Sequence, residues 1–181
     1  MDFFVYSRDA SDTAALRDAH AEEHWAYMDG FAASMIARGP TLDADGETAT
    51  GSLHVLGLPS VEEARRFVAL EPNNRAGIYA EHLIWRFENL LGRTMWESPG
   101  HGPDPRFLVI ARSGERPPPA DAVSANLIVY GALATLDAGE PAGAALALQA
   151  RDRDAVHALM RDELAAFSGV EIHDWELGGR R

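Results

Sequence analysis

The sequence repeats one pattern of glycines, turns and aromatic residues in its two halves, and this repeat constrains the fold most strongly. Gly39 corresponds to Gly131 in the second half, and Trp85 corresponds to Trp175. The turn sequence at residues 42–47 returns at residues 136–140 with one residue fewer. A chain of 181 residues is therefore expected to fold as two copies of one small unit.

The first copy has the pattern of a βαββαβ unit. Residues 3–6 are a short aromatic strand, and Ser11 or Asp12 is expected to cap a helix in which apolar residues recur as far as Met35. A turn at residues 43–46 leads to a strand at 51–58, which predicts a hairpin. Ser60 is expected to cap a helix through residue 70, and residues 78–87 form a fourth strand. The fold class is therefore α+β, with two ferredoxin-like βαββαβ units in tandem.

The second copy is shorter, and the missing residues fall in one place. The offset between the copies drops from 104 at the first strand to 92 at the hairpin, so twelve residues are lost from the first helix. Three prolines at 117–119 precede a stretch at 120–126 that is long enough for about two helical turns and contains no histidine. Residues 98–106 are rich in proline and glycine and read as a linker. We predict domains at 1–97 and 107–181, joined by the linker at 98–106.

Charge and composition exclude several classes of function. The excess of 28 acidic over 16 basic residues gives a formal charge of −12, which disfavours nucleic acid and anionic membranes as partners. The sequence has no cysteine, so it has no disulfide, thiol nucleophile or thiolate metal site. It has no phosphate-binding glycine loop and no dinucleotide fingerprint, so we expect no cofactor. No long apolar run appears, and we expect a soluble, cytoplasmic protein.

Several short motifs of the first half occur together in the order seen in one known family. They are His24, Gly39-Pro40, Gly51-Ser52, Glu71-Pro72, Ala76-Gly77 and Tyr79. On these residues the segment 1–97 resembles the YciI-like (YCII-related) family of the dimeric ferredoxin-like, or dimeric α/β-barrel, group. The resemblance implies that the second half packs on the first as an intramolecular pseudo-dimer, with a further homodimer left open. It also implies that His24 and an acidic residue are a catalytic pair lining a pocket, where Glu71 replaces the usual aspartate.

His24, Glu71, Ser52 and His54 are the candidate site residues. A carboxylate can hold an imidazole in one tautomer for proton transfer near neutral pH, which gives His24 and Glu71 catalytic roles. Ser52 and His54 lie two residues apart on one strand face, where they can bind a substrate. Their second-half counterparts, Ala144 and Leu146, lack these groups, whereas Glu71 keeps an acidic counterpart, Glu163. One working pocket per chain is therefore expected.

Other readings of the polar residues stay open. A buried histidine with a structural carboxylate is the plain alternative for His24 and Glu71. The segment from His20 to His24 also spells a His-x-x-Glu-His metal pattern, but no third ligand is evident, and we expect no metal. Arg38 and Arg75 are further candidates for binding an anionic substrate.

The remaining histidines and the tryptophans are given structural roles. His82, His157, His173 and His101 are expected to be structural or exposed, without partners at catalytic spacing. Trp25 adjoins His24 and could cover it, while Trp85 and Trp175 are expected to pack in the core or in an interface.

The residues favour a cofactor-independent small-molecule enzyme of the lyase or isomerase type. Elimination, isomerisation or cyclisation would each need His24 to move a proton between substrate atoms, with Glu71 orienting it. The resemblance adds dehydrochlorination of a chlorinated hydroxyhydroquinone as a family activity, and polyketide cyclases and cofactor-free monooxygenases as relatives. The alternative is a non-catalytic small-molecule-binding or accessory protein, and a third possibility is a structural partner for another subunit.

Overall fold

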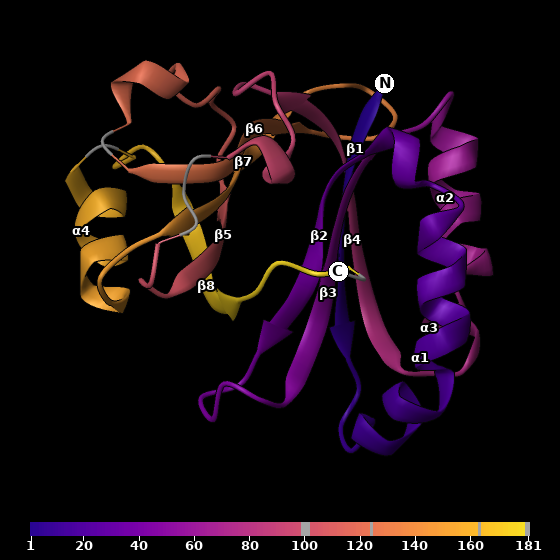
Figure 1. Ribbon diagram of the computed structural model, residues 1–181. Coiled ribbons are helices and arrows are strands. Elements are labelled where there is room, and N and C mark those ends of the chain that lie inside the picture. The colour runs from indigo at the N-terminus through magenta and orange to yellow at the C-terminus, as the bar shows by residue number, and fades with distance from the viewer. Residues whose placement is uncertain (99–101, 124, 163, 180–181) are drawn as a thin grey trace.

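The strands of the two halves join into one closed ring in the computed structural model, which describes residues 1–98, 102–123, 125–162 and 164–179 (Figure 1). The first half contributes β1 (Asp2–Asp9), β2 (Met35–Leu42), β3 (Ala49–Gly57) and β4 (Tyr79–Asn89). The second half contributes β5 (Arg106–Arg112), β6 (Asn126–Ala134), β7 (Pro141–Gln149) and β8 (Ser168–Trp175). The ring runs β1-β3-β2-β8-β5-β7-β6-β4, and all of its pairings are antiparallel.

Each half has the same strand order, and two equivalent junctions close the ring. β4 pairs with β6 through residues 86–89, and β2 pairs with β8 where Thr41 and Leu42 meet Trp175 and Asp174. The helices lie on opposite outer sides of the ring, with α1 (Ala14–Asp29), α2 (Val61–Leu70) and α3 (Pro72–Arg75) on the first half and α4 (Arg153–Asp162) on the second (Figure 1). The predicted fold class, two βαββαβ-like units packed as a pseudo-dimer, is confirmed.

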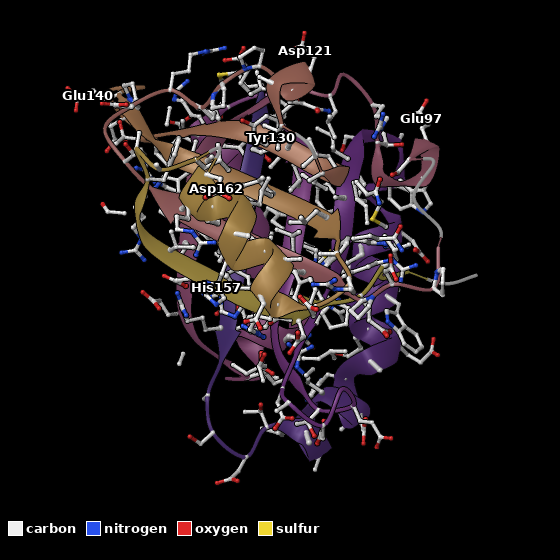
Figure 2. The ribbon with its side chains drawn as sticks, turned by 90° about the vertical axis from the view of Figure 1, so that its left-hand side faces the viewer. Glu97, Asp121, Tyr130, Glu140, His157 and Asp162 are labelled. Atoms are coloured by element: carbon white, nitrogen blue, oxygen red, sulfur yellow. The ribbon has the colours of Figure 1, made fainter. Side chains whose placement is uncertain are left out.

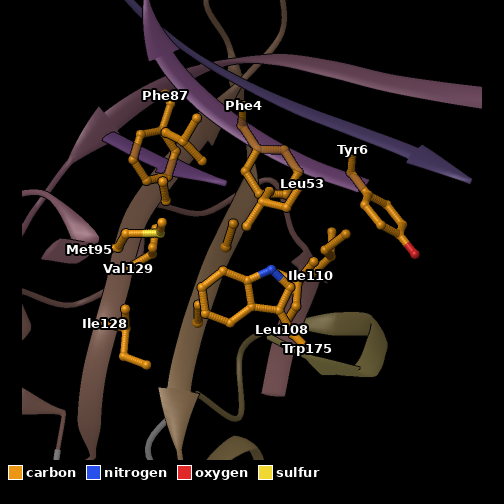
Figure 3. Close-up of a cluster of buried hydrophobic side chains, with 14 of the residues drawn as sticks. Phe4, Tyr6, Leu53, Phe87, Met95, Leu108, Ile110, Ile128, Val129 and Trp175 are labelled. Atoms are coloured by element: carbon orange, nitrogen blue, oxygen red, sulfur yellow. The ribbon is translucent and has the colours of Figure 1, made fainter. Parts of the chain in front are cut away.

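The interior of the ring is one hydrophobic core shared by both halves. Phe4 and Leu53 of the first half pack with Leu108, Ile110 and Trp175 of the second, and all five are fully buried (Figure 3). Trp175 is the largest of these side chains and is 1% exposed. Since neither half can bury these side chains alone, the two units are expected to fold as one cooperative body.

Strand alternation places a second set of side chains on the outer face of the first half. Along β3, Leu53 and Val55 point into the ring, whereas Ser52 and His54 point out toward the helices. Part of this outer face is covered by an apolar cluster that includes Phe3, Val5, Met28, Leu56 and Phe67. The rest of the face carries the polar residues of the candidate site.

The second half is covered on its outer face mainly by α4. Val156, Leu159 and Met160 of this helix pack onto the strands, while His157 lies on its exposed surface (Figure 2). The connection between β5 and β6 contains one 3-10 turn, Ala120–Ala122, where about two helical turns were predicted. That prediction was wrong because the strand begins at Asn126, which leaves too few residues after the prolines for a second turn.

The first helix is shorter than its apolar pattern predicted. It ends at Asp29, and Met35 instead begins β2, which contains Gly39 and Pro40. Met35 is apolar because, as the first residue of this strand, it is buried in the outer apolar cluster with Met28 and Leu56. The N-cap is Thr13, without a side-chain capping bond, and neither Ser11 nor Asp12 occupies that position.

Some of the predicted features involve residues that the structure does not describe. Residues 99–101 of the expected linker, with His101, and the acidic counterpart Glu163 lie outside the described residues. The domain limits stay predictions, although Arg106, which we placed in the linker, is the first residue of β5. No helix in the described part of the chain is both long and apolar enough to cross a membrane.

Candidate functional site

A pocket of about 250 Å³ opens between α1 and the outer face of β2 and β3. Its polar lining includes Arg17, His24, Arg38, Ser52, His54 and Asn73. Three of the four predicted site residues, His24, Ser52 and His54, therefore share one cavity. The fourth, Glu71, contacts His24 from behind the lining.

The position of Glu71 follows from the proline after it. Because a residue before proline is disfavoured in helical conformation, Glu71 adopts an extended backbone with φ −61° and ψ 128° and separates α2 from α3. Its side chain then caps α3, since its Oε2 accepts a hydrogen bond of 2.8 Å from the backbone N–H of Asn74. The other oxygen, Oε1, is left for His24.

His24 is joined to Glu71 by a short hydrogen bond of 2.5 Å between Nδ1 and Oε1. The Glu71 side chain is 3% exposed and that of His24 is 15% exposed, so the bond is shielded from water. A carboxylate only accepts hydrogen bonds, so the Nδ1 atom carries the hydrogen and Nε2 is the basic nitrogen of the neutral ring. His24 thus has the arrangement of an oriented acid–base group.

His54 lies beside His24, with 5.7 Å between their ring centroids. It is 3% exposed and also packs edge-to-face against Phe67. Burial, together with the nearby charges of His24, Arg38 and Arg17, holds the pKa of His54 well below its usual value of 6.5. His54 is therefore neutral at neutral pH and can offer the pocket a polar but uncharged imidazole.

Ser52 is held by residues that the sequence reasoning did not select. Its Oγ accepts a hydrogen bond of 3.1 Å from Arg17 and one of 3.0 Å from the Tyr79 hydroxyl. Burial raises the pKa of Tyr79 to about 12, so this phenol stays protonated and donates. Arg17 is anchored by Asp9 through bonds of 2.5 and 2.6 Å. With two bonds accepted, the Ser52 hydroxyl keeps its own hydrogen to donate.

Arg17 could have been found from spacing alone. It lies seven residues before His24 in α1, which is two helical turns and hence the same helix face. Tyr79 offered a weaker signal, because it belongs to the resemblance motifs but follows the loop before β4. The glycines Gly178 and Gly179 also line the pocket, and nothing local in the sequence points to them.

His82, which was predicted to be structural or exposed, has polar partners on both ring nitrogens. Its Nδ1 lies 2.9 Å from the Ser7 hydroxyl and its Nε2 lies 2.8 Å from Oδ1 of Asn74. Burial lowers the pKa of His82, which favours the neutral ring. Asn74 also bonds to Glu71, so His82 supports the loop that carries the carboxylate.

His173 also has polar partners, across the junction of the halves. Its ring packs against Tyr6 with 5.1 Å between centroids, and its Nε2 lies 3.4 Å from Glu171. Burial lowers the pKa of His173. This histidine belongs to the polar contacts between β1 and β8 and lies outside the pocket lining.

Of the remaining residues considered from the sequence, some line the pocket and others lie away from it. Trp25 lines the pocket and is 40% exposed, in line with a covering role at the mouth. His20 is half-buried and contacts Glu23 outside the pocket lining, while Arg75 is exposed. Within the described ranges no cluster of three or more histidine, aspartate or glutamate side chains is arranged to hold a metal ion.

Comparisons with known proteins agree with this architecture. Residues 1–88 match the YCII-related domain, and no curated protein matches the chain. One similar structure is 5-chloro-2-hydroxyhydroquinone dehydrochlorinase (TftG) from Burkholderia phenoliruptrix AC1100, in complex with 2,5-dihydroxybenzoquinone. It is 29% identical, has a TM-score of 0.47, and the match covers 49% of this chain and 95% of that chain.

Two other similar structures match almost the whole chain. A chlorite dismutase from Candidatus Nitrospira defluvii is 10% identical with a TM-score of 0.60, and the match covers 97% of this chain and 90% of that one. An anthrone oxidase-like protein is 13% identical with a TM-score of 0.51, covering 99% and 92% of the two chains. These two likenesses concern the fold alone. Residues 1–88 of the chain therefore form a YCII-related domain, and the whole chain has the dimeric α/β-barrel fold.

Proposed function

We propose that the chain is a cofactor-independent enzyme that moves a proton on a compact small molecule, with His24 as the acid–base residue. The observation that carries this proposal is the 2.5 Å bond between His24 Nδ1 and Glu71 Oε1 at the wall of a pocket. Glu71 keeps the basic Nε2 atom of His24 available and stabilises the imidazolium that forms when it takes a proton. The reaction belongs to the elimination, isomerisation or cyclisation class.

The proton and electrons balance without a further reactant. His24 Nε2 removes a proton from a substrate carbon or hydroxyl, and the electron pair left behind forms a new double bond. In an elimination the leaving group departs with its bonding pair, whereas in an isomerisation His24 returns the proton to a second atom. The sequence has neither lysine nor cysteine, so a Schiff-base amine or a thiolate is not the reacting group.

Ser52 and His54 supply neutral polar contacts to the substrate in this proposal. The Ser52 hydroxyl donates, because Arg17 and Tyr79 already occupy its acceptor sites. The neutral ring of His54 can donate or accept. A cavity of about 250 Å³ is below the roughly 300–1,000 Å³ of sites for drug-sized ligands, which favours a single-ring substrate.

A panel of single-ring compounds in D₂O tests the function. Compounds with a hydroxyl group beside a removable proton or halide, 5-chloro-2-hydroxyhydroquinone among them, are followed by proton NMR for deuterium exchange and loss of the leaving group. His24→Gln is expected to lower the rate about 10²–10⁴-fold, the usual contribution of a general acid or base. His20→Gln is the matched control, because it changes a histidine one turn earlier on the same helix, outside the pocket.

Two outcomes would count against the proposal. Turnover that is equal in wild type and His24→Gln would remove the acid–base role. Saturable binding of panel compounds without turnover in any variant would assign the pocket to a binding protein instead.

A further inference from the structure

Arg38 is an incompletely paired cation in the wall of the pocket. It lies on β2 directly opposite His54 on β3, so both side chains project from the same outer face. Its side chain is 13% exposed, and its Nε is buried without a hydrogen-bond partner in the described part of the chain. Its Nη2 lies 3.6 Å from Asp29, longer than a hydrogen bond. A guanidinium in this state has donors to offer to a ligand.

Arg17, the other arginine of the pocket, differs in this respect. Its Nε and Nη2 donate to both carboxylate oxygens of Asp9, and Nη2 also donates to Ser52. The Asp9 side chain is only 5% exposed, so this pair is neutralised within the protein. Among the described residues that line the pocket, one arginine is therefore committed to structure and one has unused donors.

The C-terminal segment of the second half runs back beside the strands of the first half (Figure 1), where it contacts Arg38. After β8 the chain continues along β2, where the N–H of Glu176 bonds to the carbonyl of Pro40 at 3.1 Å and the N–H of Gly178 bonds to that of Arg38 at 2.9 Å. At Gly179 φ is +121°, and an added Cβ would lie 2.6 Å from Nη2 of Arg38. The guanidinium therefore rests on a glycine backbone that has no room for a side chain.

We propose that Arg38, positioned by residues 176–179, is an anion-binding residue that takes a carboxylate, enolate or phenolate oxygen of a single-ring substrate. The planar fork of arginine donors matches a carboxylate, and one arm is enough for a single oxyanion. Removing a proton beside a carbonyl creates negative charge on that oxygen, and Arg38, which lines the same pocket as His24, can stabilise that charge. The inference rests on the proposed function and adds the substrate class, a compact organic anion. It also gives the second half a part in the site.

Benzoate and its neutral isostere benzamide provide the test, measured by isothermal titration calorimetry on the full chain. Benzoate is expected to bind wild type at least about tenfold more tightly than benzamide, because charge-assisted hydrogen bonds are stronger than neutral ones. Arg38→Gln is expected to remove this preference, with benzamide binding unchanged. Arg75→Gln is the matched control, because it removes an exposed arginine outside the pocket. A benzoate preference that persists in Arg38→Gln, or that is absent in wild type, overturns the proposal.

The positioning role of the C-terminal segment has its own variant. Gly179→Ala places a Cβ against the guanidinium and is expected to weaken benzoate binding about tenfold while the circular dichroism spectrum stays unchanged. Gly114→Ala is its control, because an added Cβ there meets nothing within 4 Å. Equal benzoate affinity in Gly179→Ala and wild type would show that residues 176–179 do not position Arg38.

The two proposals fail separately. If benzoate binding depends on Arg38 but no panel compound is turned over, the anion site stands and the enzymatic function falls. If turnover needs His24 but Arg38→Gln leaves KM and kcat unchanged, the function stands and the anion site falls.

Discussion

Trp175→Ala is expected to destabilise the whole chain, because this side chain fills the core shared by the two halves. Trp175 is 1% exposed and packs inside the ring with residues of both halves (Figure 3). Truncating a buried tryptophan to alanine costs about 3–5 kcal/mol of unfolding free energy. For a chain of this size each kcal/mol lowers Tm by about 2–4 °C, so the midpoint should fall by about 6–20 °C. Urea and thermal unfolding followed by circular dichroism measure both quantities.

Trp85 is the matched control, since it is a tryptophan of β4 that packs against the same core; by strand pairing, the position equivalent to Trp175 is Phe87. It is only partly buried and packs at the margin of the same core, with its ring 6.0 Å from Phe4. Trp85→Ala is therefore expected to cost only about 1–2 kcal/mol, in proportion to the smaller area removed from water. Both variants should unfold in a single transition. Two separate transitions, or a larger loss in Trp85→Ala than in Trp175→Ala, would refute the shared core.

Three further substitutions test the site and one ring junction. Glu71→Ala should lower the unfolding free energy by about 2–4 kcal/mol in urea titrations, because it removes the cap of α3 and leaves the buried Nδ1 of His24 unpaired. A loss below about 1 kcal/mol would count against this expectation. The folded-state pKa of His54 is depressed, so the neutral ring is favoured and stability should fall as pH drops below about 6.5, by up to about 1.4 kcal/mol per pH unit from this group. His54→Gln should flatten that slope between pH 7.5 and 5.5, and an unchanged slope would disprove the assignment. Gly131→Ala would place a Cβ 2.2 Å from the ring of Phe87 at the junction of β4 and β6, so a midpoint loss equivalent to about 1–3 kcal/mol is expected in thermal melts, and wild-type stability would contradict it.

Local patterns in the sequence predicted most of the fold. Ser60 caps α2 as expected, because its hydroxyl accepts a hydrogen bond from the N–H of Glu63. The repeated strand order is present, with a 3-10 turn in place of the first helix of the second half. The extent of the first helix was misjudged because its apolar residues are not all buried: Leu16 of α1 is 41% exposed, whereas Met35 is buried as a strand residue. A spacing of three and four residues between apolar side chains cannot tell a long helix from a short helix followed by a strand when few of the helix side chains are buried.

The sequence predicted those parts of the site whose residues lie close together along the chain or alternate along one strand. Ser52 and His54 share a face because of the two-residue period, and the Glu-Pro pair sets the position of Glu71. Gly179 and Arg38 meet only because β8 pairs with β2 across the ring, a contact between residues far apart in the sequence. No local pattern in the sequence carries that information. The contribution of the second half to the pocket could therefore be recognised only in the three-dimensional structure.

A crystal structure of the wild-type chain with a turned-over compound or its product tests the central claim most directly. The account predicts that the ligand occupies the pocket between α1 and β3, with Nε2 of His24 about 2.6–3.2 Å from the atom that loses or gains the proton. Glu71 should keep its bond to Nδ1 in that complex. A ligand bound elsewhere, or one whose reacting atom lies beyond reach of His24, would contradict the account.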